Sequence, residues 1–399
     1  MNHKLLTITA ICATMMACNS KTETVLPTSV ELPGTVDNEA FANNVESISV
    51  MNLQMDDAWT LTNAPWLALS NNYIYLLEGR QLRLTCLDRH TGGKLSGRTI
   101  KGNGPGEILG LNSIFCVGDT LCIYDNKNFI CKYDHNCGFV GKTHEFSNIP
   151  QIYNLLPLGS QKYAFVALCQ WNTSDLTNKA ILLTDSSFNI TSEHFSPPQL
   201  NLYFAGNNPC YVDGDTLRVI FLYDNKLYTL FGESEQCTEL GLPNPLTPEI
   251  ANELFESDDD EAFNKYDGVF RGLCGSGRSL FVKYYINNVC HSSFIDKRTN
   301  KAVTIIDDDK EPTTTADLVC DFFKKITIIK SEGKYIYAYC NVINIVRPFK
   351  IHANLLDERL LATKTEFDAY LERNAEYIKD LEPDERVEAN VILKIKLKD

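Results

Sequence analysis

The stretch GDTLCIYDNKNFICKYD, residues 118–134, has the pattern of a complete β-hairpin. A polar turn at Gly118-Asp119 precedes a mostly apolar strand, a short Asn-rich turn follows it, and a second strand ends at Asp134. Aromatic and β-branched residues bounded by Gly, Asn and Asp are typical of strands and hairpins. The same order of turn and strand recurs at residues 72–88, 214–230 and 333–351, and more weakly at 163–185 and 279–296. Repeats of one hairpin therefore organise the chain.

Six such units favour an all-β fold, a six-bladed β-propeller with two short helical insertions. Each blade would be a four-stranded meander, and closing the ring removes exposed sheet edges. The alternating segment 390–398 is expected to complete the last blade together with residues 47–50, and 348–351 to be a strand of the copy at 333–351. Thr247 before Pro248 predicts the start of one helix. An apolar stripe over 364–381 predicts the other.

Residues 1–17 have the layout of a secretory signal peptide, because one lysine precedes an apolar run too short to cross a bilayer. The run ends at Met15-Met16-Ala17-Cys18, which resembles the lipobox of bacterial lipoproteins. That resemblance implies lipidation of Cys18 and membrane anchoring through the lipid. The alternative is ordinary signal cleavage nearby, with Cys18 an idle thiol.

The residues that follow the signal are rich in Ser, Thr and Pro and have no apolar periodicity. This composition predicts a lipidated flexible tether over 18–45 and the propeller over 46–399. The expected location is the cell envelope, as an outer-membrane lipoprotein on its periplasmic or surface face.

The formal net charge of -14 argues against nucleic acid as a partner, because phosphates require a basic surface. It argues equally against binding anionic lipid head groups through the folded body. The chain has 14 cysteines, and many of them lie in apolar, strand-like runs where a small thiol packs well. We therefore expect mostly reduced, buried thiols. Cys131 with Cys137 and Cys116 with Cys122 are the pairs close enough in sequence to test for disulfides.

The segment KGNGPGE, residues 101–107, follows the first repeat. Gly102, Gly104 and Gly106 permit positive φ, Pro105 stiffens the loop, and Glu107 can accept backbone hydrogen bonds. We interpret these five residues as a structural turn between blades. A phosphate-binding loop is the alternative, but it would need a Lys-Ser/Thr pair and a following helix.

This glycine motif resembles the G-x-G-P-G-E signature of the NHL-like six-bladed β-propeller lipoproteins of gut anaerobic bacteria. The lipobox, the helix before the end and the closing strand resemble that family as well. The chain departs from it at Glu388-Ala389-Asn390, where the family usually has Asp-Asn-Pro. The resemblance implies the propeller fold, and most members of the family are of unknown function.

Candidate chemistry is sparse in this sequence, so the catalytic residues are unknown and we expect neither a metal nor a cofactor. The seven histidines do not have metal-ligand spacing. The acidic runs 258–261 and 307–309 fit solvated loops better than calcium sites. Trp171, within a long excursion between two strands, is the candidate for stacking on a ligand such as a sugar ring.

Two functions stay open. The first is an envelope-anchored lipoprotein that serves as a non-catalytic binding or scaffold module for a glycan or protein partner. The second is a metal-dependent propeller hydrolase or lactonase that acts at the central channel, where the inner strands converge.

Overall fold

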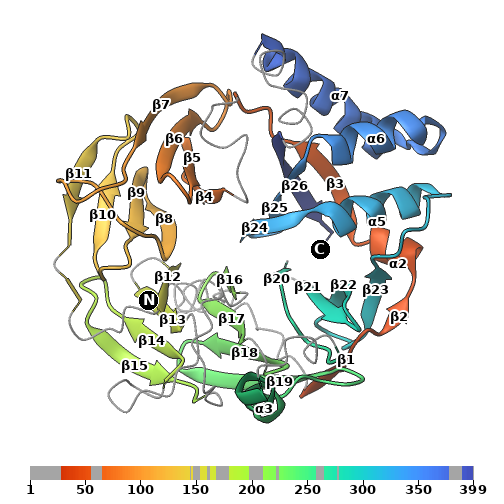
Figure 1. Ribbon diagram of the computed structural model, residues 1–399, viewed down its shortest axis with the longest axis horizontal. Coiled ribbons are helices and arrows are strands. Elements are labelled where there is room, and N and C mark those ends of the chain that lie inside the picture. Colours follow the sequence, from red (N-terminus) through yellow and green to blue (C-terminus); the bar gives the residue numbers. More distant parts are fainter. Residues whose placement is uncertain are drawn as a thin grey trace, which may run out of the picture.

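The computed structural model describes residues 28–54, 65–143, 145–146, 153–159, 162–167, 179–196, 210–221, 224–257, 265–275, 278–376 and 389–398. Six separate β-sheets are arranged around a central axis (Figure 1). The prediction of an all-β, six-bladed propeller is confirmed. The signal segment, Cys18 and Trp171 lie outside the described residues.

Blades 1 to 3 are four-stranded antiparallel meanders. Blade 1 comprises β4 (Trp66–Leu69), β5 (Tyr73–Glu78), β6 (Arg83–Asp88) and β7 (Lys94–Thr99). Blade 2 comprises β8 (Ser113–Val117), β9 (Thr120–Tyr124), β10 (Ile130–Tyr133) and β11 (Phe139–Lys142). Blade 3 comprises β12 (Tyr153–Leu158), β13 (Lys162–Ala167), β14 (Ile181–Thr184) and β15 (Ile190–His194). The second and third strands are the most deeply buried in each, because neighbouring blades cover both of their faces.

Blades 4 and 5 each carry a fifth strand, which the N-terminal part of the chain supplies. Blade 4 comprises β16 (Cys210–Asp213), β17 (Thr216–Ile220), β18 (Lys226–Phe231) and β19 (Ser234–Gly241), with β1 (Ser29–Glu31) outside them. Blade 5 comprises β20 (Gly272–Gly275), β21 (Ser279–Ile286), β22 (Val289–Asp296) and β23 (Ala302–Ile306), with β2 (Thr35–Val36) outside them. Both added strands run parallel to their neighbours.

We call residues 28–43 the N-terminal strap, because they follow the outer edges of blades 4 and 5. The strap also contains the short helix α2 (Asn38–Ala42). The flexible tether expected over 18–45 is therefore wrong for residues 28–45, which contain β1, β2, α2 and the start of β3. Val30 and Leu32 are each 3% exposed and pack into a core cluster with blades 4 and 5. Burial of these apolar side chains stabilises the packing of the strap on the propeller.

Blade 6 joins the two ends of the chain. It comprises β24 (Thr327–Glu332), β25 (Tyr335–Asn341), β26 (Asn390–Leu397) and β3 (Val45–Val50). β26 pairs antiparallel with β25 on one side and with β3 on the other. The predicted closing strand and its N-terminal neighbour are thus confirmed, and backbone hydrogen bonds close the ring.

Helices are more numerous than the sequence predicted. The two expected insertions correspond to α3 (Pro248–Ser257) and α7 (Glu358–Arg373). The unexpected ones are α2, α5 (Thr315–Lys325) and α6 (Ile343–Ile351), with a short 3-10 turn at Ala353–Leu355. Figure 1 shows α2, α5, α6 and α7 gathered outside the ring beside blades 5 and 6. No helix among the described residues is long and apolar enough to cross a membrane.

The strand expected over 348–351 is wrong, because these residues belong to α6. Ile345, Pro348 and Phe349 are the buried residues of this helix, and their spacing places them on one helical face. β26 occupies the sheet position that this segment was expected to fill.

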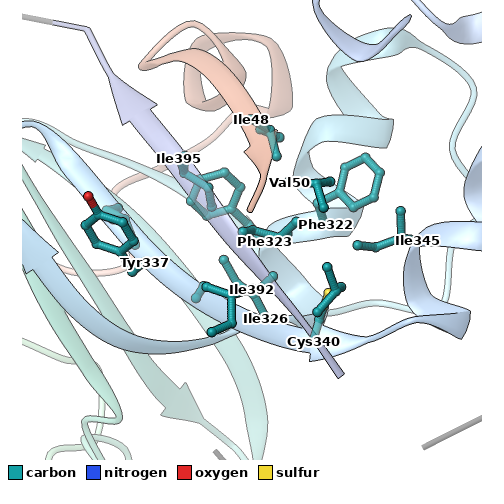
Figure 2. Close-up of a cluster of buried hydrophobic side chains, with 14 of the residues drawn as sticks. Ile48, Val50, Phe322, Phe323, Ile326, Tyr337, Cys340, Ile345, Ile392 and Ile395 are labelled. Atoms are coloured by element: carbon teal, nitrogen blue, oxygen red, sulfur yellow. The ribbon is translucent and has the colours of Figure 1, made fainter. Parts of the chain in front are cut away.

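The largest core cluster lies between blade 6 and the helices rather than inside one blade. Figure 2 shows Phe322 and Phe323 of α5 close to side chains of the blade 6 strands and to Ile345 of α6. From the strap, the Phe41 ring adds contacts with Phe294 and Phe323, at centroid distances of 4.6 and 5.2 Å. The helices and the strap are therefore part of the packed core.

All 11 cysteines within the described residues are free thiols, and seven of them are buried. Cys131 and Cys137 are not bonded to each other, nor are Cys116 and Cys122. This agrees with the expectation of mostly reduced thiols that pack as small apolar side chains.

Candidate ligand pocket

A surface pocket of about 360 Å³ lies between the segment that follows β23 and the helices α5 and α6. Charged side chains provide most of its wall, and two prolines and an isoleucine add apolar surface. The lining residues are Asp307, Asp308, Asp309, Lys310, Glu311, Pro312, Asp321, Lys325, Arg347, Pro348, Ile351 and His352.

Helix α5 forms one wall of the pocket and is fixed at both ends. At its N-terminus, Thr314 and Asp317 form a capping box that satisfies otherwise unpaired backbone groups. Burial alone would raise the pKa of Asp317, but hydrogen bonds from Asn38 and the preceding threonines hold that pKa well below its usual value. At the C-terminus, Lys283 Nζ donates to the carbonyl oxygens of Phe323, Lys324 and Ile326 at 3.3, 3.2 and 3.0 Å. Hydrogen bonds at both ends therefore fix the position of α5, and with it this wall of the pocket.

Asp308 ties the segment after β23 to α5. Its Oδ1 accepts a hydrogen bond from Lys324 Nζ at 2.7 Å, and its Oδ2 lies 2.7 Å from Lys310 Nζ. Partial burial would raise the pKa of Asp308, but the two ammonium groups lower it below its usual value. The same contact raises the pKa of Lys310. The ion pairs of Asp308 with Lys324 and Lys310 therefore define part of the wall.

Two further pairs lie in the wall. Lys325 Nζ and Asp321 Oδ2 are 2.6 Å apart, one helical turn from each other on α5. His352 Nε2 lies 3.2 Å from Glu311 Oε2, which brings the end of α6 to the segment after β23. Most charges of the pocket thus have a partner within the wall itself.

The side chains of Arg347, Asp307 and Asp309 differ from the other charged groups of the pocket. All three residues are exposed, and none of these side chains forms a hydrogen bond or an ion pair with the described residues. A guanidinium group has five N–H donors, and a carboxylate has about four acceptor positions. The pocket therefore presents one guanidinium donor and two carboxylate acceptors that are available to a ligand.

The glycine motif lies elsewhere, at the crossing from blade 1 to blade 2. Glu107 Oε2 accepts a hydrogen bond from the Gly104 N–H at 2.7 Å, and the Glu107 N–H donates to the Gly104 carbonyl oxygen at 3.0 Å. Gly106 has a φ of +73°, and a Cβ there would overlap the ring of Phe139. Tyr133 Oη donates to the Gly106 carbonyl oxygen at 3.1 Å. The contacts of Gly104, Gly106 and Glu107 are thus with the protein's own backbone and rings.

We expect Glu107→Ala to lower the free energy of unfolding by about 1–2 kcal/mol, because the Gly104 N–H loses its side-chain acceptor. Urea unfolding followed by circular dichroism measures the change. Glu107→Gln keeps one amide oxygen and should lose less. Equal midpoints for Glu107→Ala and the wild type would show that the carboxylate does not stabilise the loop.

His194 is a buried residue that the sequence did not single out. Its Nδ1 lies 3.0 Å from Glu235 Oε1 of blade 4, and its Nε2 lies 2.9 Å from Ser192 Oγ. This order of serine, histidine and carboxylate is known from hydrolases. Here Glu233 is a second carboxylate, 3.4 Å from both His194 Nε2 and Ser192 Oγ. The hydroxyl is thus held on two sides, and we interpret the group as a contact between blades 3 and 4.

Of the acidic runs, 307–309 lines the pocket, whereas 258–261 lies outside the described residues. Within the described ranges, no group of three or more His, Cys, Asp or Glu side chains is arranged to hold a metal ion. Sequence reasoning missed Arg347, Asp321 and Lys325. The spacing of Asp321 and Lys325, four residues apart, is a helical charge pattern that could have indicated α5.

Comparison with known proteins places this geometry in a family. A family model described as a six-bladed β-propeller, DUF5128, matches residues 22–339. The chain belongs to the DUF5128 family. No protein among those with curated functions is detectably similar in sequence.

Two solved structures resemble this DUF5128 propeller. One is a protein of Bacteroides fragilis NCTC 9343 inferred to be exported, with 16% identity and a TM-score of 0.64, and the match covers 93% of this chain and 99% of the other. The second is a DUF4221 member from Bacteroides vulgatus, with 8% identity and a TM-score of 0.51. That match covers 90% of this chain and 99% of the other. At these identities the likeness concerns the fold alone.

Proposed function

We propose that this DUF5128 protein is an outer-membrane lipoprotein that serves as a non-catalytic binding or scaffold module for a glycan or protein partner. The signal-like segment 1–17 and the lipobox ending at Cys18 support export and anchoring. The similarity to a Bacteroides fragilis protein inferred to be exported supports the same compartment.

The observation that carries the binding role is the pocket beside α5 and α6. Its walls are held by ion pairs and by capping of α5, so it exists before a ligand arrives. A preformed site binds without first ordering its own side chains, which lowers the entropy cost of binding. The propeller provides the rigid body on which such a site is displayed.

Anchoring is tested in cells with Cys18→Ser. We expect the wild type in the membrane fraction and Cys18→Ser in the soluble fraction, because the thioether lipid cannot form without the thiol. Cys12→Ser, which changes a cysteine inside the signal segment, is the matched control and should remain with the membrane. If Cys18→Ser stays in the membrane fraction as the wild type does, the lipid anchor is excluded.

Binding is tested on the same cells by cross-linking and affinity isolation, together with a glycan array probed with the purified full chain. We expect a glycan or a protein partner to be enriched with the wild type. A protein that enriches no partner in either experiment but turns over a substrate would contradict the binding role.

A further inference from the structure

We propose that the pocket beside α5 and α6 binds a neutral, hydroxyl-rich ligand the size of a mono- or disaccharide, with Arg347 and Asp309 as its main hydrogen-bonding residues. This assignment rests on the proposed binding function and names the chemistry of its ligand. Three properties of the pocket support this assignment: the balance of its charges, the pairing of these charges with one another, and its volume.

The charge balance disfavours a strongly charged ligand. Five carboxylates line the pocket, from Asp307, Asp308, Asp309, Glu311 and Asp321, against three basic side chains, from Lys310, Lys325 and Arg347. Lys324 adds a further cation through its contact with Asp308. The two signs nearly cancel, so neither an anion nor a cation gains much from the field of the pocket as a whole.

The pairing of these charges favours hydroxyl groups. Asp308, Asp321 and Glu311 already contact cationic or ring nitrogen groups, so a charged ligand group must compete with an existing partner. A hydroxyl group both donates and accepts, and each carboxylate has acceptor positions beyond those its partner uses. Sugar hydroxyl groups can therefore form hydrogen bonds with the carboxylates of these ion pairs without breaking any of the pairs.

Among the unpaired groups, Arg347 on α6 and Asp309 on the segment after β23 are the proposed anchor points. Arg347 can donate two parallel hydrogen bonds to neighbouring ligand oxygens, and Asp309 can accept from ligand hydroxyls. Pro312 and Ile351 supply apolar surface for the C–H face of a sugar ring, and Ile351 is 55% exposed. Ligand pockets commonly combine such apolar contact with a few polar groups that fix orientation.

The size agrees with this ligand. About 360 Å³ lies near the lower end of the range of roughly 300–1,000 Å³ that is usual for ligand pockets. This space accommodates a small saccharide, or the terminal unit of a longer glycan whose remainder extends into solvent.

The test uses ligand-observed NMR on the purified full chain. The neutral probes are maltose, cellobiose, lactose and N,N′-diacetylchitobiose, with glucuronic acid as an anionic probe and glycylglycine as a zwitterionic probe. We expect at least one neutral disaccharide to bind the wild type and Arg347→Ala to weaken that binding at least tenfold. Lys350→Ala removes an exposed cation of the same helix that does not line the pocket, and it should leave binding unchanged. Asp309→Asn should weaken binding severalfold.

Several outcomes would overturn the assignment: binding of the charged or zwitterionic probes alone, no binding of any probe at millimolar concentration, or equal binding by Arg347→Ala and the wild type. Arg347 and Asp309 are exposed, so these substitutions leave the fold intact, which circular dichroism checks. A partner that the cross-linking experiment enriches equally with Arg347→Ala would keep the proposed binding role but place it away from this pocket.

Discussion

Phe41→Ala is expected to lower the free energy of unfolding by about 3–5 kcal/mol, the usual cost of removing a buried phenylalanine ring. Phe41 is fully buried, and its ring lies 4.6 Å from Phe294 and 5.2 Å from Phe323 between centroids. The substitution therefore leaves a cavity between the strap, blade 5 and α5. Urea unfolding followed by fluorescence or circular dichroism measures the loss.

Val36→Ala is the matched control for this prediction, because Val36 lies in the same strap but is 53% exposed. We expect it to change the free energy of unfolding by less than about 0.5 kcal/mol. If Phe41→Ala also falls within that limit, the strap does not pack on the ring in solution.

The second large effect is expected for Ile392→Asp, which should prevent the protein from folding. Ile392 is fully buried in β26, the strand that pairs with both β25 and β3. An unpaired carboxylate in that position loses its hydration without gaining a partner, which costs several kcal/mol. Because β26 closes the ring, the loss would affect the whole propeller and not one blade alone.

Ile392→Val is the conservative control, because it removes only one methylene group. It should lower the free energy of unfolding by about 1 kcal/mol. Limited proteolysis and circular dichroism of purified material distinguish the two variants. If Ile392→Asp unfolds within about 1 kcal/mol of the wild type, the assignment of β26 as the closing strand is wrong.

The blades could be predicted from the sequence because their signal is local. In a hairpin such as β9 and β10, the paired residues lie within 20 positions of one another, so turn residues and alternation identify both strands. The closing strand was also predictable, since residues 390–398 alternate over a long run.

The strap and α6 were not predictable for different physical reasons. Val30 pairs with Leu240, so its burial depends on a contact more than 200 residues away and leaves no local periodicity. In α6, the four residues from Pro348 to Ile351 satisfy a short alternating pattern as well as a helical one. Packing on α5 then decides in favour of the helix.

Only part of the pocket could be predicted from the sequence. The acidic run 307–309 by itself predicts a solvated loop, because nothing nearby in the sequence shows that Lys324 pairs with Asp308. Arg347 directly precedes residues 348–351, for which the sequence predicts a strand and the structure has the end of α6. The pocket forms only when α5 and α6 are in place, so its chemistry follows from packing and not from a motif.

The strap also determines how far a lipid-anchored propeller can stand from the bilayer. A free chain from Cys18 to Val45 has 27 residue steps and could extend to about 95 Å, whereas only ten steps separate Cys18 from Thr28, which allows at most about 36 Å. Thr28 is held at blade 4, where its carbonyl oxygen accepts a hydrogen bond from the Glu239 N–H. In the proposed lipoprotein, the rim of blade 4 therefore stays close to the lipid surface, and a long glycan or a bulky protein has to approach from the opposite side of the ring.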